Sequence, residues 1–532
     1  MKIPSPPRPE LLALAGLAVA LVAVACAEGP KPTSTTADTT TFAPATTEPE
    51  LCPDVFCIRY DIRPDATWSD GTPVTSDDFI HTYEAQSSSP GYSLITGFEA
   101  TDDKTILFAF SEPYGPWQTL FGVVVPAHAE DPLSVSAGSF VLGPVGEEVI
   151  LLRNPESPHS GDVESIRFVR LDSVRDGLER MRSSELDLWF PPAVDWVVDG
   201  LEGMDGVEFD VGPGPVWDHI DFNLDDPLLG QEWVRRVINL SFDPQTFVEE
   251  YLREIDPEAG LLLSAVWSRA SAHYLPNFPS EFNPDLARRR MIDQGCDLED
   301  DGVFSCDGAR MSFSYATTIG DQWRLALFES FRDAMALVGI EVIGEFLAPT
   351  ALFAEDFLFG GPDKWQIISF PWAFSADPHL GDSRFICQGE APNGHGALNV
   401  IRFCDPEVEN LVIEAQTEID PASRVALYHE ADRAYLRHVP MIPIFQRPVI
   451  MAWVSSLQGP TGTTIAGISS WSGPAEVTVG VNRIPKEIDP LRPDDDDGLI
   501  LTLVTAGAFT TNESLEYVPV LIESAETISG GR

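Results

Sequence analysis

The stretch WSDGTPVTSDDFIHTY, residues 68–83, combines a rigid turn with the start of a helix. Gly71 tolerates a positive φ angle and Asp70 can accept hydrogen bonds from nearby backbone amides, so the pair favours a tight turn. Thr75 is a good N-cap, and the two aspartates that follow place negative charge at the positive end of the helix dipole. The stretch therefore predicts a strand–turn–helix corner whose helix buries Phe79.

The composition describes a large, strongly acidic protein. The chain has 532 residues, 44% of them hydrophobic, which allows a sizeable core and predicts two or three domains. It carries 33 Lys and Arg against 83 Asp and Glu, a formal net charge of -50. Such a surface repels nucleic acid and anionic lipid headgroups, so we expect no nucleic-acid partner. The simplest interpretation of the charge is solubility.

The first 26 residues resemble the export signal of a bacterial lipoprotein. A weakly basic start is followed by LLALAGLAVALVAVA, residues 11–25, an apolar run too short for a comfortable membrane span. The run leads into Cys26 and resembles a lipobox with Ala23 where Leu is more usual. The resemblance implies that Cys26 is lipidated, which would anchor the protein to the outer face of the cytoplasmic membrane. Ordinary signal cleavage just before the cysteine is the alternative.

Residues 27–50 predict a tether between this signal and a folded body. They are rich in Thr, Pro and Ala, and such a segment cannot bury a core. Signal, tether and body together predict an exported protein of the cell envelope.

Six further cysteines fall into neighbouring pairs, as expected for an exported protein. The pairs are Cys52 with Cys57, Cys296 with Cys306, and Cys387 with Cys404. Six cysteines allow fifteen connectivities, so pairing by proximity is a prediction and not a deduction. Metal binding is the alternative. No pair has C-x-x-C spacing or a companion histidine cluster, so we expect neither a metal site nor a cofactor.

The rest of the chain mixes strand and helix patterns. TILFAFSEP (residues 105–113) and VWDHIDFNL (216–224) predict strands. WRLALFESFRDAMALVGIEVIGEF (323–346) predicts a long helix, a glycine C-cap and a strand, as in a βαβ unit. Residues 406–438 predict helices, and MIPIFQRPVIMAWV (441–454) predicts apolar strands. The predicted class is α/β with antiparallel additions.

These motifs, in this order, resemble those of the bacterial extracellular solute-binding proteins of the peptide/nickel class, the exported receptors of ABC importers. The opening stretch resembles the family signature W-S-D-G-T-P-x-T-A-x-D-F, and VWDHIDFNL resembles the hinge strand. The agreement covers most of residues 57–456. Further matching segments are WVRRVINLSFDPQTF (233–247), FNPDLARRRMIDQG (282–295), LVGIEV (337–342) and residues 403–445.

The resemblance implies a periplasmic-binding-protein-like α/β fold with two lobes around a cleft. Lobe I would combine residues 51–222 with 446–532, and lobe II would hold residues 223–445. The hinge would lie near Asn223 and Pro443. Ligand binding would shift an open–closed equilibrium, and an ABC permease would recognise the closed form. No covalent step is needed, so we expect a monomeric binding protein and not an enzyme.

The order of segments departs from the family at the front. Pieces that usually precede the signature corner are missing there, yet AEVTVGVNRIPKEIDPL (475–491) and LEYVPVLIESAE (515–526) resemble them. This order resembles a circular permutation, with the new ends meeting near Leu51 and Arg532. A truncated tandem copy or a misplaced gene boundary is the alternative, and this tail would then not pack against residues 57–150.

The resemblance also suggests where a ligand would bind. The family places a ligand-contacting segment at SFPWAFSADPH (369–379), and peptide-binding members carry an Asp three residues before its Asp-Pro pair. Here Phe374 stands at that position, which weakens the case for a free peptide amino terminus, although Asp377 would substitute if the loop is shifted. Trp372 and Phe374 suggest an aromatic wall, with core packing as the alternative. The candidate ligand-binding residues are Trp372, Phe374, Asp377, Trp217 and Asn223.

Three functions stay open. The first is a receptor delivering a peptide or other small organic solute to an ABC transporter. The second is an envelope lipoprotein binding a lipid or glycolipid in cell-wall assembly, because residues 91–95 and 116–121 resemble segments of actinobacterial lipoproteins on this fold. The third is an exported hydrolase, although no hydrolase, Walker A or dinucleotide motif is present. Two acidic stretches, DLEDDG (297–302) and DDDDG (494–498), have some character of calcium loops and more simply predict solvated loops.

Overall fold

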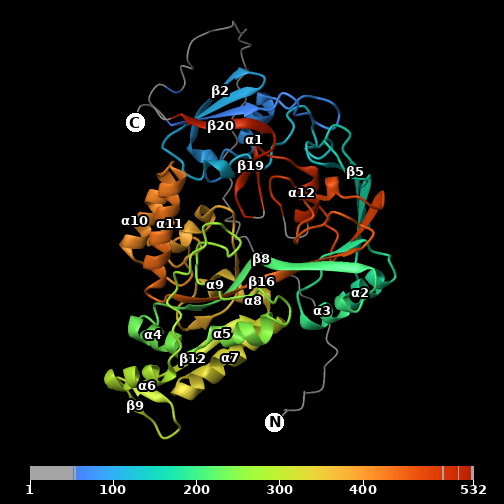
Figure 1. The fold of residues 1–532 in the computed structure, drawn as a ribbon. Coiled ribbons are helices and arrows are strands. Elements are labelled where there is room, and N and C mark those ends of the chain that lie inside the picture. The colour runs from blue at the N-terminus through green and yellow to red at the C-terminus, as the bar shows by residue number, and fades with distance from the viewer. Residues whose placement is uncertain (1–51, 53–55, 494–496, 513, 529–532) are drawn as a thin grey trace.

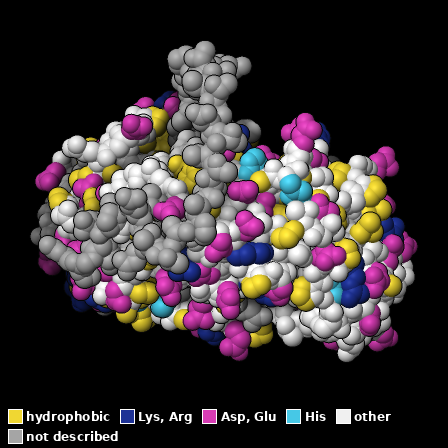
Figure 2. All heavy atoms as spheres, turned by 90° about the horizontal axis from the view of Figure 1, so that it is seen from above, with side chains coloured by type: hydrophobic (Ala, Val, Ile, Leu, Met, Phe, Trp, Pro, Cys, Tyr) yellow, Lys and Arg dark blue, Asp and Glu magenta, His cyan; other side chains and the backbone are white. Residues whose placement is uncertain are grey.

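The computed structural model describes residue 52 and residues 56–493, 497–512 and 514–528. The predicted signal, the lipidation of Cys26, the tether, and the meeting of the ends at Leu51 and Arg532 lie outside the described residues. Within the described part, every helix is too short or too polar to cross a bilayer. On the face seen in Figure 2, acidic side chains are scattered widely, with fewer basic ones among them.

A four-stranded antiparallel sheet joins the start of the described chain to its end. Its order is β2-β3-β1-β20. The strands are β1 (Cys57–Ile62), β2 (Ile95–Asp102), β3 (Thr105–Phe110) and β20 (Ile522–Ile528). β20 pairs with β1 from Ile528 opposite Cys57 to Ile522 opposite Ile62. Figure 1 shows this C-terminal strand, in red, lying with the blue N-terminal strands.

The predicted corner is confirmed beside this sheet. Helix α1 (Ser76–Gln86) begins after Thr75, and Asp78 Oδ2 accepts the Thr75 amide at 2.8 Å. The same oxygen accepts the indole N–H of Trp68 at 3.2 Å, so one carboxylate joins the turn to the helix. Phe79 is fully buried, as predicted.

A larger sheet contains the two longest strands of the described chain. Its order is β13-β12-β14-β8-β16-β7-β17-β6-β5-β4, with β15 paired to β8. The strands are β4 (Phe140–Val145), β5 (Glu148–Arg153), β6 (Ser165–Arg170), β7 (Leu188–Trp189), β8 (Val207–Phe222), β12 (Ser312–Thr318), β13 (Glu341–Leu347), β14 (Ile367–Ile368), β15 (Pro371–Ala373), β16 (Met441–Val454) and β17 (Glu476–Val481). The longest two, β8 and β16, pair antiparallel at its centre.

The remaining elements cover these sheets. The other helices are α2 (Val174–Arg182), α3 (Asp195–Glu202), α4 (Glu232–Ser241), α5 (Pro244–Phe247), α6 (Pro284–Asp293), α7 (Gln322–Val338), α8 (Pro349–Leu352), α9 (Glu355–Leu358), α10 (Pro406–Thr417), α11 (Pro421–Leu436) and α12 (Gly498–Val504). Short 3-10 or π turns are η1 (Tyr92–Leu94), η2 (Trp117–Thr119), η3 (Val248–Leu252), η4 (Pro378–Phe385) and η5 (Ile468–Ser470). The small strands are β9 (Asp297–Leu298), β10 (Phe304–Cys306), β11 (Ala309–Arg310), β18 (Phe509–Thr511) and β19 (Tyr517–Pro519).

The hydrophobic cores define the two lobes of this α/β fold. The largest core takes all its fully buried members from residues 217–445, and we call this part lobe II. Three smaller cores draw almost entirely on residues before and after that range, and we call this part lobe I. On β8 the change of core falls between Val211 and Trp217. On β16 it falls between Phe445 and Ile450.

The change of core falls on β8 before the predicted hinge residue Asn223, and on β16 after Pro443. Strand residues 216–222, assigned to lobe I in the sequence analysis, contribute Trp217 and Phe222 to the core of lobe II. Asn223 lies beyond them, and Pro443 pairs with His219 inside the same lobe. The sequence does carry a signal at this place, the stretch GPGP of residues 212–215, which lies between the two cores on β8.

The C-terminal tail packs within lobe I. Phe509 and Ile522 share a core with Phe56 and Trp68. β17 lies parallel to both β6 and β7 in the large sheet. This packing contradicts the alternative in which the tail would stay apart from residues 57–150.

The three predicted disulfides are confirmed. Cys52 is bonded to Cys57, Cys296 to Cys306, and Cys387 to Cys404. All six sulfur atoms are used in these bonds, so none is left for the metal-binding alternative.

Removing core volume from the tail tests its role in lobe I. Ile522 is 1% exposed, so Ile522→Ala is expected to lower the free energy of unfolding by about 2–5 kcal/mol, measured by urea denaturation. Ile343 lies on β13 and is 55% exposed, so Ile343→Ala is the matched control and is expected to cost less than about 1 kcal/mol. Equal effects of the two substitutions would contradict the packing of the tail in lobe I.

Candidate functional site

The two long strands meet closely where the chain crosses between the lobes. A Cβ atom on Gly214 would lie 2.7 Å from the Val449 side chain and 2.9 Å from the Arg447 carbonyl, so the crossing requires glycine. The pairing of β16 shifts register on both sides of Gln446. The Gln446 side chain spans the irregularity, because its amide nitrogen donates to the Gly214 carbonyl at 2.8 Å and to Ser268 Oγ at 2.9 Å.

A buried ion network pins one face of this crossing. Arg447 on β16 donates through Nε and Nη2 to the two oxygens of Asp218 on β8, at 2.5 and 3.0 Å. Its Nη1 donates to Asp321, the N-cap of α7, at 2.9 Å. Burial raises the pKa of Asp218, but the charge and hydrogen bonds of Arg447 outweigh it and hold that pKa below its usual value. The network therefore keeps its charges and ties β16, β8 and α7 together.

The opposite face of the crossing carries an aromatic wall, formed by Trp217, His219, Trp372 and Phe374. Trp217 and His219 are two residues apart on β8, so their side chains lie on the same face of the sheet. Trp372 of β15 pairs with Trp217 in register. The Phe374 ring stacks on Trp217 with centroids 5.1 Å apart, and Trp372 stacks on His219 at 6.1 Å. Trp217 and His219 are fully buried, whereas Trp372 and Phe374 are partly exposed. Trp372 and Phe374 thus form a partly exposed apolar surface that rests on the buried side chains of Trp217 and His219.

A guanidinium group lies against the wall. The Arg384 guanidinium carbon is 5.9 Å from the centroid of Trp217, within cation–π range. Its Nη2 donates to the Ala265 carbonyl at 3.0 Å, and burial lowers its pKa. Within the wall, His219 Nδ1 lies 2.8 Å from Asp221 Oδ1. His219, Asp221 and Arg384 were not predicted, although alternation along WDHID places Trp217, His219 and Asp221 on one face.

Of the predicted ligand residues, the structure brings Trp217, Trp372 and Phe374 together and holds Asp377 and Asn223 by other contacts. Arg424 donates to both oxygens of Asp377, at 2.6 and 2.7 Å. Burial raises the pKa of Asp377, but hydrogen bonds from His379 and Arg424 lower it by more than burial raises it. The net pKa is below the usual value, so the carboxylate stays charged. Asn223 is fully buried, and its side chain donates to the Trp365 carbonyl at 3.0 Å.

A second buried carboxylate, Asp382, lies on the same short helix as His379. Its Oδ2 accepts hydrogen bonds from Gln416 Nε2 at 2.9 Å and from the Tyr428 hydroxyl at 2.8 Å. Its Oδ1 has no hydrogen-bond partner within the described part of the chain. Burial, together with the negative charge of Asp377, raises the pKa of Asp382 to about 7 although its two hydrogen bonds oppose the rise.

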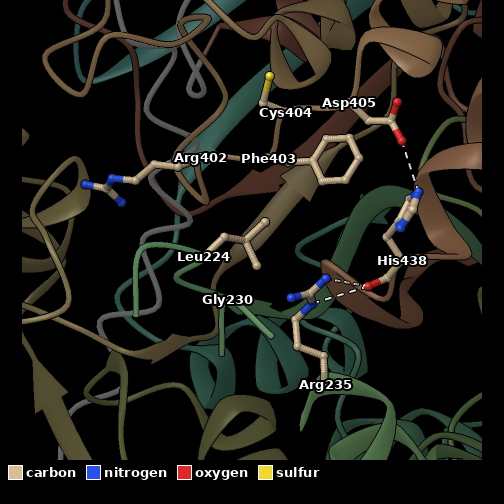
Figure 3. Close-up of a pocket in the computed structure, with 8 residues that line it drawn as sticks. All are labelled: Leu224, Gly230, Arg235, Arg402, Phe403, Cys404, Asp405 and His438. Atoms are coloured by element: carbon tan, nitrogen blue, oxygen red, sulfur yellow. Dashed lines mark hydrogen bonds and ion pairs between the residues drawn. The ribbon is translucent and has the colours of Figure 1, made fainter. Parts of the chain in front are cut away.

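A surface pocket of lobe II holds charged groups that fasten its own loops. Its lining is Leu224, Gly230, Arg235, Arg402, Phe403, Cys404, Asp405 and His438. Figure 3 shows the Arg235 guanidinium directed at the His438 carbonyl, while Arg402 points away from the other labelled side chains. Arg235 also donates to the carbonyl of Val439, a β-branched residue held at φ 48°. These contacts fix the turn that leads into β16.

The acidic stretches behave as ordinary loops where they are described. Glu299 and Asp301 both pair with Arg310, at 3.2 and 2.7 Å. Part of the DDDDG stretch lies outside the described residues. Among the residues that the structure does describe, no group of three or more His, Cys, Asp or Glu side chains is placed to hold a metal ion.

Comparison with known families identifies the fold and its class of activity. The model for "Bacterial extracellular solute-binding proteins, family 5 Middle" matches residues 41–380, more than half of the chain. The chain belongs to this family. Family 5 proteins are extracytoplasmic binding proteins and not enzymes, as predicted for this chain.

The chain is also similar to individual binding proteins. The oligopeptide-binding protein OppA of Mycobacterium tuberculosis is 24% identical over 473 residues, covering 82% of this chain and 76% of OppA. The structure of NikZ from Campylobacter jejuni in complex with Ni(L-His) superposes with a TM-score of 0.65 at 16% identity, covering 81% of this chain and 92% of NikZ. The "Probable monoacyl phosphatidylinositol tetramannoside-binding protein LpqW" of M. tuberculosis is 30% identical over 121 residues, which is 19% of each chain.

The pKa of Asp382 predicts a specific pH dependence of stability. Between about pH 4 and pH 7 the folded state keeps a proton that the unfolded state has lost, so this group's contribution to stability falls as pH rises. Asp382→Asn removes the titration. The unsubstituted protein should lose this contribution to stability between about pH 4 and pH 7, and the variant should show no such loss. The difference in the free energy of unfolding, variant minus unsubstituted protein, is expected to increase by up to about 1.4 kcal/mol for each unit of pH rise, measured by urea unfolding.

The control for this measurement is Asp300→Asn, which changes an exposed carboxylate in a surface loop. Its stability should follow that of the unsubstituted protein across the same pH range. Parallel pH curves for Asp382→Asn and the unsubstituted protein would show that Asp382 keeps an ordinary pKa.

Proposed function

We propose that this family 5 protein is an extracytoplasmic lipoprotein that delivers a peptide or other small organic solute to an ABC transporter. The observation that carries the proposal is the aromatic wall at the crossing of β8 and β16. Two partly exposed rings, Trp372 and Phe374, stand there on a fully buried pair. Ligand sites of this kind are largely preformed, apolar and located where lobes meet.

The wall favours a solute with an apolar or aromatic face. The rings of Trp372 and Phe374 offer dispersion contacts and area to be removed from water. Asp377, the predicted partner for a free ammonium group, already binds Arg424 through both oxygens. A buried ammonium without a paired carboxylate is unfavourable, so a ligand that depends on one at Asp377 is disfavoured.

The rest of the proposal concerns attachment and domain organisation. Lipidated Cys26 would hold the protein at the membrane, and lobe closure around the solute would present a monomer to the permease. Lobe I would combine residues 51–222 with 446–532 and lobe II residues 223–445, adjusted so that β8 crosses near Gly214. The pairing of β20 with β1 supports a circular permutation as the origin of this order.

A second candidate is an envelope protein on the same fold that binds a lipid or glycolipid in cell-wall assembly. The stretch of 121 residues that is 30% identical to LpqW favours it. An aromatic wall would suit an acyl chain as well as an apolar solute. We make no proposal for a hydrolase, because the family consists of binding proteins.

Native mass spectrometry of the purified protein separates these candidates. A bound peptide pool should appear as a ladder of masses, and a glycolipid as a series spaced by methylene units. A hydrophobic series would overturn the importer proposal in favour of the second candidate. A protein that carries no small molecule, even when isolated directly from its own envelope, would count against both.

Removing the exposed half of the wall tests its part in binding. The double variant Trp372→Ala/Phe374→Ala is expected to lose about tenfold or more of the co-purified small molecule per protein, because two aromatic contacts are removed. Trp196→Ala is the control, since Trp196 is 42% exposed on α3 of lobe I. Native mass spectrometry gives the ratio, and full retention by the double variant would place the ligand elsewhere.

A further inference from the structure

The two lobes touch at a corner of lobe I formed by Tyr114 and Gly115, which we call the latch. Tyr114 belongs to a lobe I core and stacks on Phe110 with ring centroids 6.4 Å apart. Its hydroxyl lies 3.2 Å from His379 Nε2, on η4 of lobe II. The Gly115 amide donates to the Gln416 carbonyl of α10 at 2.7 Å. Two hydrogen bonds therefore join the lobes at this point.

The latch completes the end of a helix. Gln416 lies in the last turn of α10, where carbonyl groups have no partner within the helix. Neighbouring carbonyls of this turn are satisfied inside lobe II, that of Ala415 by Arg424 Nε at 3.0 Å. The Gln416 carbonyl is satisfied from the other lobe, by Gly115. Separation of the lobes would return this carbonyl to water.

The contact leaves no room for a side chain at position 115. A Cβ atom built on Gly115 would lie 2.5 Å from the Glu418 carbonyl oxygen, 2.9 Å from the Ala415 carbonyl oxygen and 2.9 Å from Arg424 Nε. All three atoms belong to lobe II, and the two carbonyls are backbone atoms that cannot rotate away. Any residue other than glycine must therefore move the lobes apart, shift its own loop, or distort the end of α10.

The lobe II residues that contact the latch are themselves held in place by hydrogen bonds. Gln416, whose carbonyl accepts from the latch, is also held through its side chain by Asp382. Arg424 is fixed by its two bonds to Asp377. Ile419, in the turn between α10 and α11, packs against the same lobe I core as Tyr114. An apolar contact thus accompanies the two hydrogen bonds, and distortion of α10 is opposed by a buried network.

We propose that Gly115 is the positioning residue of lobe closure, because its missing side chain lets the latch seat on the carboxyl end of α10. The inference rests on the proposed function in that closure is the step by which a solute would be enclosed. It goes beyond that function in naming one backbone position that sets the balance between closed and open forms.

The test compares Gly115→Ala with Gly146→Ala. Gly146 lies in the turn between β4 and β5, its φ is outside the left-handed region, and an added Cβ there meets nothing within 4 Å. Small-angle X-ray scattering without added ligand measures the closed-to-open ratio. Overpacking of this degree is expected to lower that ratio about tenfold or more for Gly115→Ala. Gly146→Ala should give the profile of the unsubstituted protein.

Hydrogen exchange provides a second readout at the same contact. Amides of residues 412–420 should exchange faster in Gly115→Ala than in Gly146→Ala, because the end of α10 is uncovered. Superimposable scattering profiles and equal exchange in the two folded variants would overturn the proposal.

A milder variant keeps the test decisive if Gly115→Ala does not fold. Tyr114→Phe removes the hydroxyl that faces His379 and keeps the stack on Phe110, so the closed-to-open ratio is expected to fall about two- to tenfold. An unchanged profile in that case would overturn the proposal. Because neither measurement uses a ligand, failure to find a bound small molecule would remove the proposed function and leave the latch intact.

Discussion

The pairing of β8 with β16 is the constraint on which the rest of the structure depends. These strands run antiparallel through both lobes, and two irregularities beside Gln446 let the ladder continue as it bends. Everything in lobe II is linked in sequence to lobe I through this pair. Relative movement of the lobes must therefore be absorbed by a few residues around Gly214 and Gln446, which places the crossing at the centre of any binding cycle.

The two faces of that strand pair carry different kinds of side chain. On one face the Asp218–Arg447 pair is largely enclosed, and a buried ion pair of this kind adds little net stability because removing both charges from water is costly. It does fix geometry, since breaking it would leave an unpaired buried charge. On the other face the aromatic wall presents apolar area. Rigid positioning on one side thus allows a preformed surface on the other.

Sequence alone predicted much of the fold, because its signals are local. The corner at residues 68–83, the capped helices and the neighbouring disulfides depend on residues close in the chain. The partners of Asp377 and Asn223 could not be predicted, since Arg424 and the Trp365 carbonyl come from distant segments. The change of core along β8 coincides with the local stretch GPGP at residues 212–215, which the strand predicted for residues 216–224 did not include. His219 was available from alternation with Trp217, but its burial depended on β15 covering it.

The pairing of β20 with β1 has a mechanical consequence. The first strand of the folded body and the last are neighbours in one sheet of lobe I, so whatever precedes Cys57 and whatever follows Ile528 attach to the same rigid unit. A pull on either end loads lobe I alone and is not transmitted through the crossing. Lobe II can therefore move about the crossing without displacing the attachment of either end.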